Sequence, residues 1–161
     1  MIRSVVPLAA GLVLAGGLSQ FPEFAQQYTQ RVGGAYVEVR AVADGFRDDA
    51  AASGKSVDEA LAAYRSAGSQ LFSDRANSMD GVFQREEFLR RHYAALTRGN
   101  GFDQLAVFLR ERDAEIAKDA AAIYRPAIPV TFSGIAHAAL GFLAGFLVLG
   151  LPLSIRRRRI A

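Results

Sequence analysis

The stretch IPVTFSGIAHAALGFLAGFLVLGLPLSI, residues 128–155, decides the fold because it carries no formal charge from end to end. A bilayer core needs roughly 20 apolar residues of helix to cross it, so we expect a transmembrane helix here. Arginines fill positions 156–159, and such a cluster stops translocation and marks the cytoplasmic side. A basic cytoplasmic tail is therefore expected at 156–161. The residues that set topology or contact lipid are expected to be Arg156, Arg157, Arg158 and Arg159.

A second uncharged stretch, SVVPLAAGLVLAGGLSQF, lies near the other end of the chain at residues 4–21. It just reaches the length that a spanning helix needs. We interpret it as a retained signal anchor, the first of two transmembrane helices. A cleaved signal peptide is the alternative, and the protein would then keep a single C-terminal anchor. The Ala-x-Ala pattern typical of a cleavage site is absent.

The charges predict an orientation. Arg3 precedes the first apolar stretch and four arginines follow the second, so both termini are expected in the cytoplasm. The middle, residues 22–127, is then outside, in the periplasm of a Gram-negative bacterium whose inner membrane holds the chain. All 16 acidic residues and all but five of the 19 basic ones lie in that middle. Because the excess positive charge sits at the ends, it does not indicate nucleic-acid binding.

The middle is predicted to be entirely helical, which makes the fold all-α. Apolar residues recur there about every 3.5 residues, as in a coiled coil. This first seam predicts a long amphipathic helix from the first span to about residue 49, and a second seam, interrupted by Glu86, predicts an antiparallel partner in the same or another chain. The first seam consists of Phe21, Ala25, Tyr28, Val32, Ala35, Val39, Val42 and Phe46, and the second of Met79, Val82, Leu89, Tyr93 and Leu96.

Local signals place the shorter helices. Ser56 and Glu59 form a capping-box pattern that opens a helix over 56–67, which Gly68 ends. The next helix is expected from 73 to about 98, where residues 99–101, Gly-Asn-Gly, stop it because such residues tolerate positive φ. Two further short helices follow, the second capped by Asp113.

Small residues at one-turn spacing suggest where apolar helices pack. Gly141 and Gly145 form a GxxxG pattern, and Gly11 with Ala15 offers a similar notch in the first stretch. These residues are expected to bring span against span or chain against chain. His137 is the one ionisable side chain within the second stretch, and an intramembrane ionisable group is a candidate for function or for a buried hydrogen bond.

No residue pattern indicates catalysis. The chain has no cysteine and two histidines, His92 and His137. His92 is expected on a solvent-facing helix surface, beside Arg90 and Arg91. Adjacent residues on a helix point in different directions, so the carboxylate pairs at 48–49 and 86–87 do not converge on one proton or metal. Both pairs are therefore expected to face solvent. Phosphate-binding, dinucleotide-binding, zinc-protease and serine-hydrolase motifs are absent. We therefore expect no catalytic residue, no cofactor, no metal and no small-molecule substrate.

The residues SQFPEFAQQY at 19–28, followed by QRVGG at 30–34, resemble the hallmark of a bacterial membrane-protein family, domain of unknown function 2937. The resemblance implies two spans and a bacterial inner membrane, and it carries no activity or catalytic residue. It also argues against cleavage near this block.

The sequence thus favours a non-enzymatic inner-membrane anchor, scaffold or accessory subunit. Its expected partners are the lipid bilayer and either itself or a larger membrane complex. The alternative is a component of a small oligomeric transporter or channel, for which only Ser19, Thr131, Ser133 and His137 offer polar groups near the spans.

Overall fold

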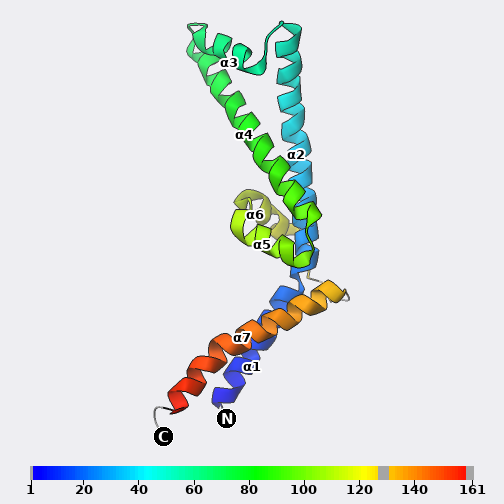
Figure 1. Ribbon diagram of the computed structural model, residues 1–161, viewed down its shortest axis with the longest axis vertical. Coiled ribbons are helices and arrows are strands. Elements are labelled where there is room, and N and C mark those ends of the chain that lie inside the picture. Colours follow the sequence, from blue (N-terminus) through cyan, green and yellow to red (C-terminus); the bar gives the residue numbers. More distant parts are fainter. Residues whose placement is uncertain (1, 127–130, 159–161) are drawn as a thin grey trace. The chain divides into compact units, whose positions relative to one another are not determined.

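The computed structural model describes residues 2–126 and 131–158, with side chains described at 5–126 and 131–148. Within these residues the protein is all-α and has no strand, as the sequence predicts. Figure 1 labels its helices, which are α1 (Ile2–Ser19), α2 (Phe21–Ala52), α3 (Val57–Ser66), α4 (Gln70–Arg98), α5 (Gly101–Glu111), α6 (Ala114–Ile123) and α7 (Phe132–Arg158). Residues 128–130 and 159–161 of the expected second span and tail lie outside the described residues, as do the side chains at 149–158.

The helices group into two compact units. The first contains Met1–Tyr28 and Gly99–Ala161, and the second contains Thr29–Arg98. The first unit therefore combines α1, α7, the start of α2, α5 and α6. The second unit combines the rest of α2 with α3 and α4.

Two polar caps and two glycine turns set the ends of the small helices. The capping box at α3 is confirmed, because the Glu59 amide donates to the Ser56 hydroxyl while the Glu59 carboxylate accepts from the Ser56 amide at 2.7 Å. Asp113 caps α6 as expected, accepting from the Ile116 amide at 2.9 Å. The two turns on either side of α3 use Gly54 and Gly68, whose φ values are 68° and 71°. Both are left-handed conformations, which glycine adopts without a steric penalty.

The Gly-Asn-Gly segment follows the end of α4 at Arg98, as expected, but no positive φ is used there. Neither Gly99 nor Gly101 adopts a positive φ. Instead Asn100 caps the following helix, α5, accepting from the amides of Phe102 and Asp103. The Asp103 carboxylate accepts in return from the Asn100 amide at 3.1 Å. The two sets of bonds complete a second capping box.

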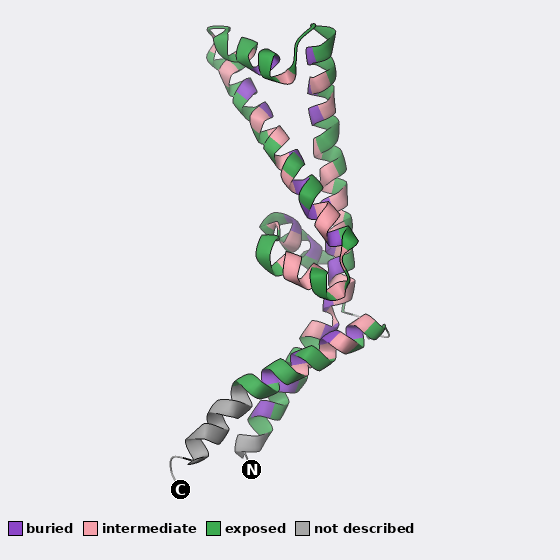
Figure 2. Cartoon of the chain, viewed as in Figure 1, coloured by how far each residue is buried: buried purple, intermediate pink, exposed green. Residues whose placement is uncertain are grey.

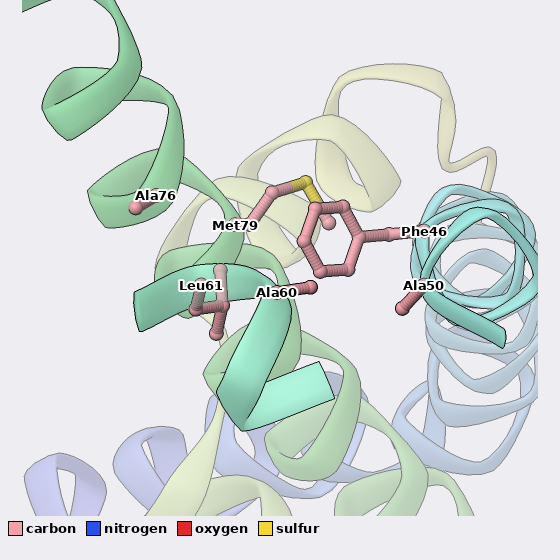
Figure 3. Packing of buried hydrophobic residues seen from close by; sticks show 6 residues of the cluster. All are labelled: Phe46, Ala50, Ala60, Leu61, Ala76 and Met79. Carbon is pink, nitrogen blue, oxygen red and sulfur yellow. The ribbon is translucent and has the colours of Figure 1, made fainter. Parts of the chain in front are cut away.

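The second unit has a small apolar core at the end where α3 joins α2 to α4. Figure 1 shows α2 and α4 running in opposite directions and spreading apart toward α3. Figure 3 shows Phe46 reaching from α2 toward Met79 and Ala60. Farther along, α2 and α4 approach closely, because a Cβ at Gly33 would lie 2.8 Å from the Tyr93 ring. The buried members of the core are Phe46, Ala50, Ala60, Leu61, Ala76 and Met79.

The first seam is displaced by one position in the second half of α2. Val42 is 49% exposed, and Ala43 is buried in its place. A straight helix has about 3.6 residues per turn and drifts about 20° per heptad from a 3.5-residue repeat. After three heptads this drift moves the buried stripe from Val42 to Ala43, so the expectation for Val42 was wrong. The coiled-coil-like pairing of α2 and α4 remains a prediction.

Two polar residues of α4 are buried, contrary to the prediction of a solvated surface. His92 is 1% exposed, with its ring stacked on Phe88 at 5.5 Å. Glu86 is also buried and pairs with Arg47 of α2, whose Nη2 donates to Glu86 Oε2 at 2.6 Å. This bond is the main cause of the raised pKa of Arg47. The Glu86 position in the second seam is therefore filled by an ion pair that links α2 to α4.

Candidate functional site, a glycine-packed helix pair and its aromatic cluster

α1 and α7 lie side by side and antiparallel in the first unit, and glycines make their contact possible (Figure 1). A Cβ at Gly145 would lie 2.7 Å from the Ala10 carbonyl oxygen. A Cβ at Gly141 would lie even closer to the Leu14 carbonyl oxygen, and 3.0 Å from the Ala15 amide nitrogen. The structure thus places the GxxxG pattern of 141–145 directly against the backbone of the notch at 11–15. Both partners belong to the same chain.

The contact is tight from both sides. A Cβ at Gly11 would lie 2.9 Å from the Phe142 ring and 3.0 Å from the Phe142 carbonyl oxygen. In contrast, a Cβ at Gly16 or Gly17 would meet nothing within 4 Å. Only some of the glycines in this apolar segment are therefore needed for packing.

Large apolar side chains of the pair point outward. Figure 2 shows buried residues along the seam between α1 and α7, with exposed residues on their outer faces. Val13, for example, is 73% exposed. This distribution is the reverse of a water-soluble protein, which buries such side chains. The exposed large apolar residues of the pair are Val5, Val6, Leu8, Leu12, Val13, Leu14, Phe132, Ile135, Leu140, Leu143, Phe146, Leu147 and Val148.

His137 lies fully buried in the second turn of α7, with 0% exposure. Its Nδ1 is 2.8 Å from the carbonyl oxygen of Ser133, and its Nε2 is 3.3 Å from the carbonyl oxygen of Gly101 in α5. Both contacts are to carbonyl oxygens, which only accept, so a ring nitrogen that bonds here must carry the proton. The ring is also stacked on Phe102, with centroids 4.4 Å apart.

Gly101 lets α5 come this close to α7. A Cβ at Gly101 would lie 2.6 Å from the Ser133 hydroxyl and 3.0 Å from His137 Cε1. The first turn of α5 is therefore held against the first turns of α7 by one close glycine, one ring stack and one histidine contact.

An aromatic cluster joins α2, α5 and the end of α6. Phe108 of α5 is its centre, with ring centroids 5.8 Å from Phe21, 5.5 Å from Phe24 and 5.1 Å from Tyr28, all in edge-on contacts. Tyr124, which follows α6, meets Phe24 edge-on at 5.7 Å. Such edge-on pairs each contribute about 0.5–1.5 kcal/mol beyond burial.

The cluster extends to α7, because Phe21 also stacks on His137 with centroids 5.8 Å apart. Two tyrosine hydroxyls tie the cluster to the backbone. The hydroxyl of Tyr28 accepts from the Asp113 amide at 2.8 Å, where α6 begins. The hydroxyl of Tyr124 donates to the carbonyl or the side-chain oxygen of Gln20, each 3.1 Å away, between α1 and α2. Burial, and secondarily the charge of Glu23, raises the pKa of Tyr124.

Sequence patterns alone do not reveal this cluster. The 3–4 spacing of Phe21, Phe24 and Tyr28 predicts one apolar helix face, and the pattern Phe102, Leu105, Phe108 predicts another. Nothing in the sequence states that these two faces meet, because they lie on helices far apart in the chain.

The described side chains contain no group of three metal-ligating residues. A pocket of about 240 Å³ opens beside the core of the second unit, with Asp49 and Lys55 as its charged lining residues. These two residues with Tyr64 and Ser53 of the same lining form no motif of a known reaction class.

Comparison with known proteins identifies the family and nothing further. No curated protein and no solved structure matches the chain. One family model, described as "Protein of unknown function (DUF2937)", matches residues 2–161. The chain therefore belongs to the DUF2937 family.

Proposed function

We propose that the protein is a two-span integral membrane protein that acts as a non-enzymatic anchor, scaffold or accessory subunit. The observation that carries the proposal is the α1–α7 pair, which has small residues inside and large apolar residues outside. Lipid removes the hydrophobic reason to bury large side chains, so helices in membranes associate through close backbone contact at small residues. The pair has that character.

The lengths of the helices support this proposal. The segment Val5–Ala52, which contains most of α1 and all of α2, includes a stretch that is long and apolar enough to cross a membrane, and that stretch is mostly exposed. In a water-soluble protein, a core helix of the same length and apolar composition would be mostly buried. The second apolar helix is shorter where side chains are described, Phe132–Val148, but α7 continues to Arg158. At about 1.5 Å per residue, α7 is roughly 40 Å long.

The packing favours retention of α1 over the signal-peptide alternative. Pro7, Gly11 and Ser19 are buried along α1, and α7 supplies Gly141 and Gly145 to fit it. Cleavage after α1 would leave the two close-packing glycines of α7 without the backbone they contact.

The polar groups near the spans support an anchor over a transporter or channel. Ser19 donates to the Gly16 carbonyl at 2.8 Å, the Thr131 hydroxyl accepts from the Gly134 amide at 3.1 Å, and His137 bonds to backbone as described. Each of these groups is thus already bonded to backbone within the first unit. If the protein nevertheless transports a solute, His137→Ala should abolish transport while assembly persists.

Topology is the first test. The chain has no cysteine, so Ser69→Cys and Ala161→Cys each provide a single thiol. In intact spheroplasts an impermeant maleimide should label Ser69→Cys and spare Ala161→Cys until lysis. The reverse result would invert the orientation, and protection or labelling of both would contradict two spans.

Association is the second test. Purification from host membranes in mild detergent, followed by native mass measurement, separates an accessory subunit from a homo-oligomer. A stoichiometric partner identifies the former, and a defined self-assembly the latter. A monomer without any partner would contradict the scaffold or subunit role.

A further inference from the structure

α5 carries a second apolar face, of which a large part stays exposed although His137 covers one side of Phe102. Phe108 is directed into the aromatic cluster, but Phe102 and Leu109 are 47% and 63% exposed. They are seven positions apart, and a helix advances about 100° per residue, so they lie on one side of α5. Leu105 falls between this side and Phe108.

This face is directed toward the α1–α7 pair. The Phe102 ring stacks on His137, and a Cβ at Gly101 would meet Ser133. Because Leu109 shares the side of Phe102, it points the same way, two turns farther along. Asp103 and Arg110 lie about 100° around the helix from this side and Glu111 lies opposite it, so the polar, exposed residues begin beside the apolar face.

α6 also ends with an exposed apolar residue, and this end lies near the end of α1. Ile116 and Ala120 are buried, and Ile123 continues their spacing but is 60% exposed. The next residue, Tyr124, bonds to Gln20 at the end of α1. The start of α5 and the end of α6 are therefore both attached where the apolar pair ends.

We propose that the face of α5 that carries Phe102 and Leu109, together with Ile123, lies in the interfacial layer of the bilayer, with lipid as its occupant. The inference rests on the proposed function, since it needs the α1–α7 pair to be in the membrane. Continuity with the outward apolar surface of that pair selects lipid, because an amphipathic helix beside a span buries its apolar side at the headgroup–acyl boundary. The polar side of α5 then faces water.

The absence of tryptophan permits a direct test on the full chain. Leu109→Trp places one fluorophore on the proposed lipid face, and Arg110→Trp places one at the same height on the polar side. Both positions are exposed, so either change should leave the fold intact, which circular dichroism verifies. Each variant is reconstituted in phosphatidylcholine vesicles with bromine attached near the headgroup or near the chain end.

We expect bromine near the headgroup to quench Leu109→Trp roughly threefold more than Arg110→Trp, as expected for an interfacial helix. Equal quenching of the two variants would overturn the inference. A blue-shifted emission of Leu109→Trp without lipid quenching would also overturn it, since protein would then cover the face.

A third variant separates this inference from the proposed function. Val13→Trp reports the outer face of α1 and should be quenched most by bromine near the chain end. If Val13→Trp is quenched and Leu109→Trp is not, the interfacial inference fails and the two-span proposal stands. If Val13→Trp is not quenched, the two-span proposal fails.

Discussion

Replacing Gly141 by alanine should weaken the α1–α7 pair, and the structure sets the size of the effect. The new methyl carbon would lie 2.7 Å from the Leu14 carbonyl carbon and 3.0 Å from the Ala15 nitrogen. Carbon atoms make their best contacts at about 3.5–4.0 Å. The obstacle is backbone, which cannot rotate away as a side chain would. The helices must therefore separate by about 1 Å, which sacrifices a quarter to a half of the dispersion energy of each nearby contact.

Overpacking of this kind costs about 1–3 kcal/mol. Because the obstacle is backbone, the cost at Gly141 belongs to the upper part of that range, about 2–3 kcal/mol. Alanine recovers up to about 1 kcal/mol through its higher helix propensity. The net loss is then about 1–2 kcal/mol, or roughly a 5–30-fold change in the pairing equilibrium. Gly141→Leu should abolish pairing.

The assay uses dyes at the open end of the pair. Val5→Cys and Val148→Cys are exposed, lie toward the same end of the antiparallel helices and accept a donor and an acceptor. Energy transfer is followed while SDS is titrated into a mild detergent. Gly16→Ala is the matched control, because its Cβ meets nothing within 4 Å. The SDS concentration at which half of the energy transfer is lost should fall for Gly141→Ala and should stay the same or rise for Gly16→Ala. Equal midpoints for wild type, Gly141→Ala and Gly16→Ala would refute the packing argument.

Three further predictions concern the polar contacts. Arg47→Ala leaves the buried Glu86 carboxylate without its cation. Urea unfolding of the second unit should therefore show a free energy of unfolding lower by about 1–2 kcal/mol, a value reduced from that of a fully buried pair because Arg47 is partly exposed. Bonds from Ser56 lower the pKa of Glu59 below its ordinary value, so their stabilisation is full above that value and is lost as pH falls through the lowered pKa. The melting temperature should therefore fall as the pH is lowered below about 4.5. It should fall less for Glu59→Gln. His137→Leu removes the contact with Gly101, so hydrogen exchange of the first turn of α5 should accelerate roughly tenfold.

Matched controls accompany these variants. Arg40→Ala breaks an exposed pair with Asp44. Because exposed pairs contribute little, this change should alter stability by only about 0.3–0.5 kcal/mol. A loss equal to that of Arg47→Ala would contradict the role assigned to burial. Ala138→Leu, next to His137, changes α7 without touching its hydrogen bonds, and its α5 exchange should remain slow. An unchanged melting point of wild type between neutral pH and about pH 3 would contradict the Glu59 prediction.

What the sequence predicts well is local. Ser56 and Glu59 are three residues apart, and their mutual bonds need no other part of the chain, so the capping box follows from the sequence directly. The same holds for Asp113. The GxxxG pattern predicts close packing, although only the structure shows that Gly141 meets α1 of the same chain.

What the sequence predicts poorly depends on distant partners or accumulated drift. Glu86 reads as a surface carboxylate because its partner, Arg47, is 39 residues away. The buried stripe moves from Val42 to Ala43 because a straight helix departs by a small angle per heptad from a 3.5-residue repeat, and this angle accumulates over three heptads. The cluster around Phe108 requires residues from several helices and the segment after α6, and no spacing within one helix predicts their meeting.

The order of synthesis adds a constraint to the α1–α7 pair. Five helices separate α1 from α7 along the chain, so α1 is made long before its partner. At about 5–20 residues per second, α1 waits roughly 5–20 s until α7 emerges. During that interval the backbone around Gly11, which α7 later contacts through Phe142, has no partner helix. The backbone of α1 around Gly11 is therefore open to any other small-residue helix until the last helix has been made.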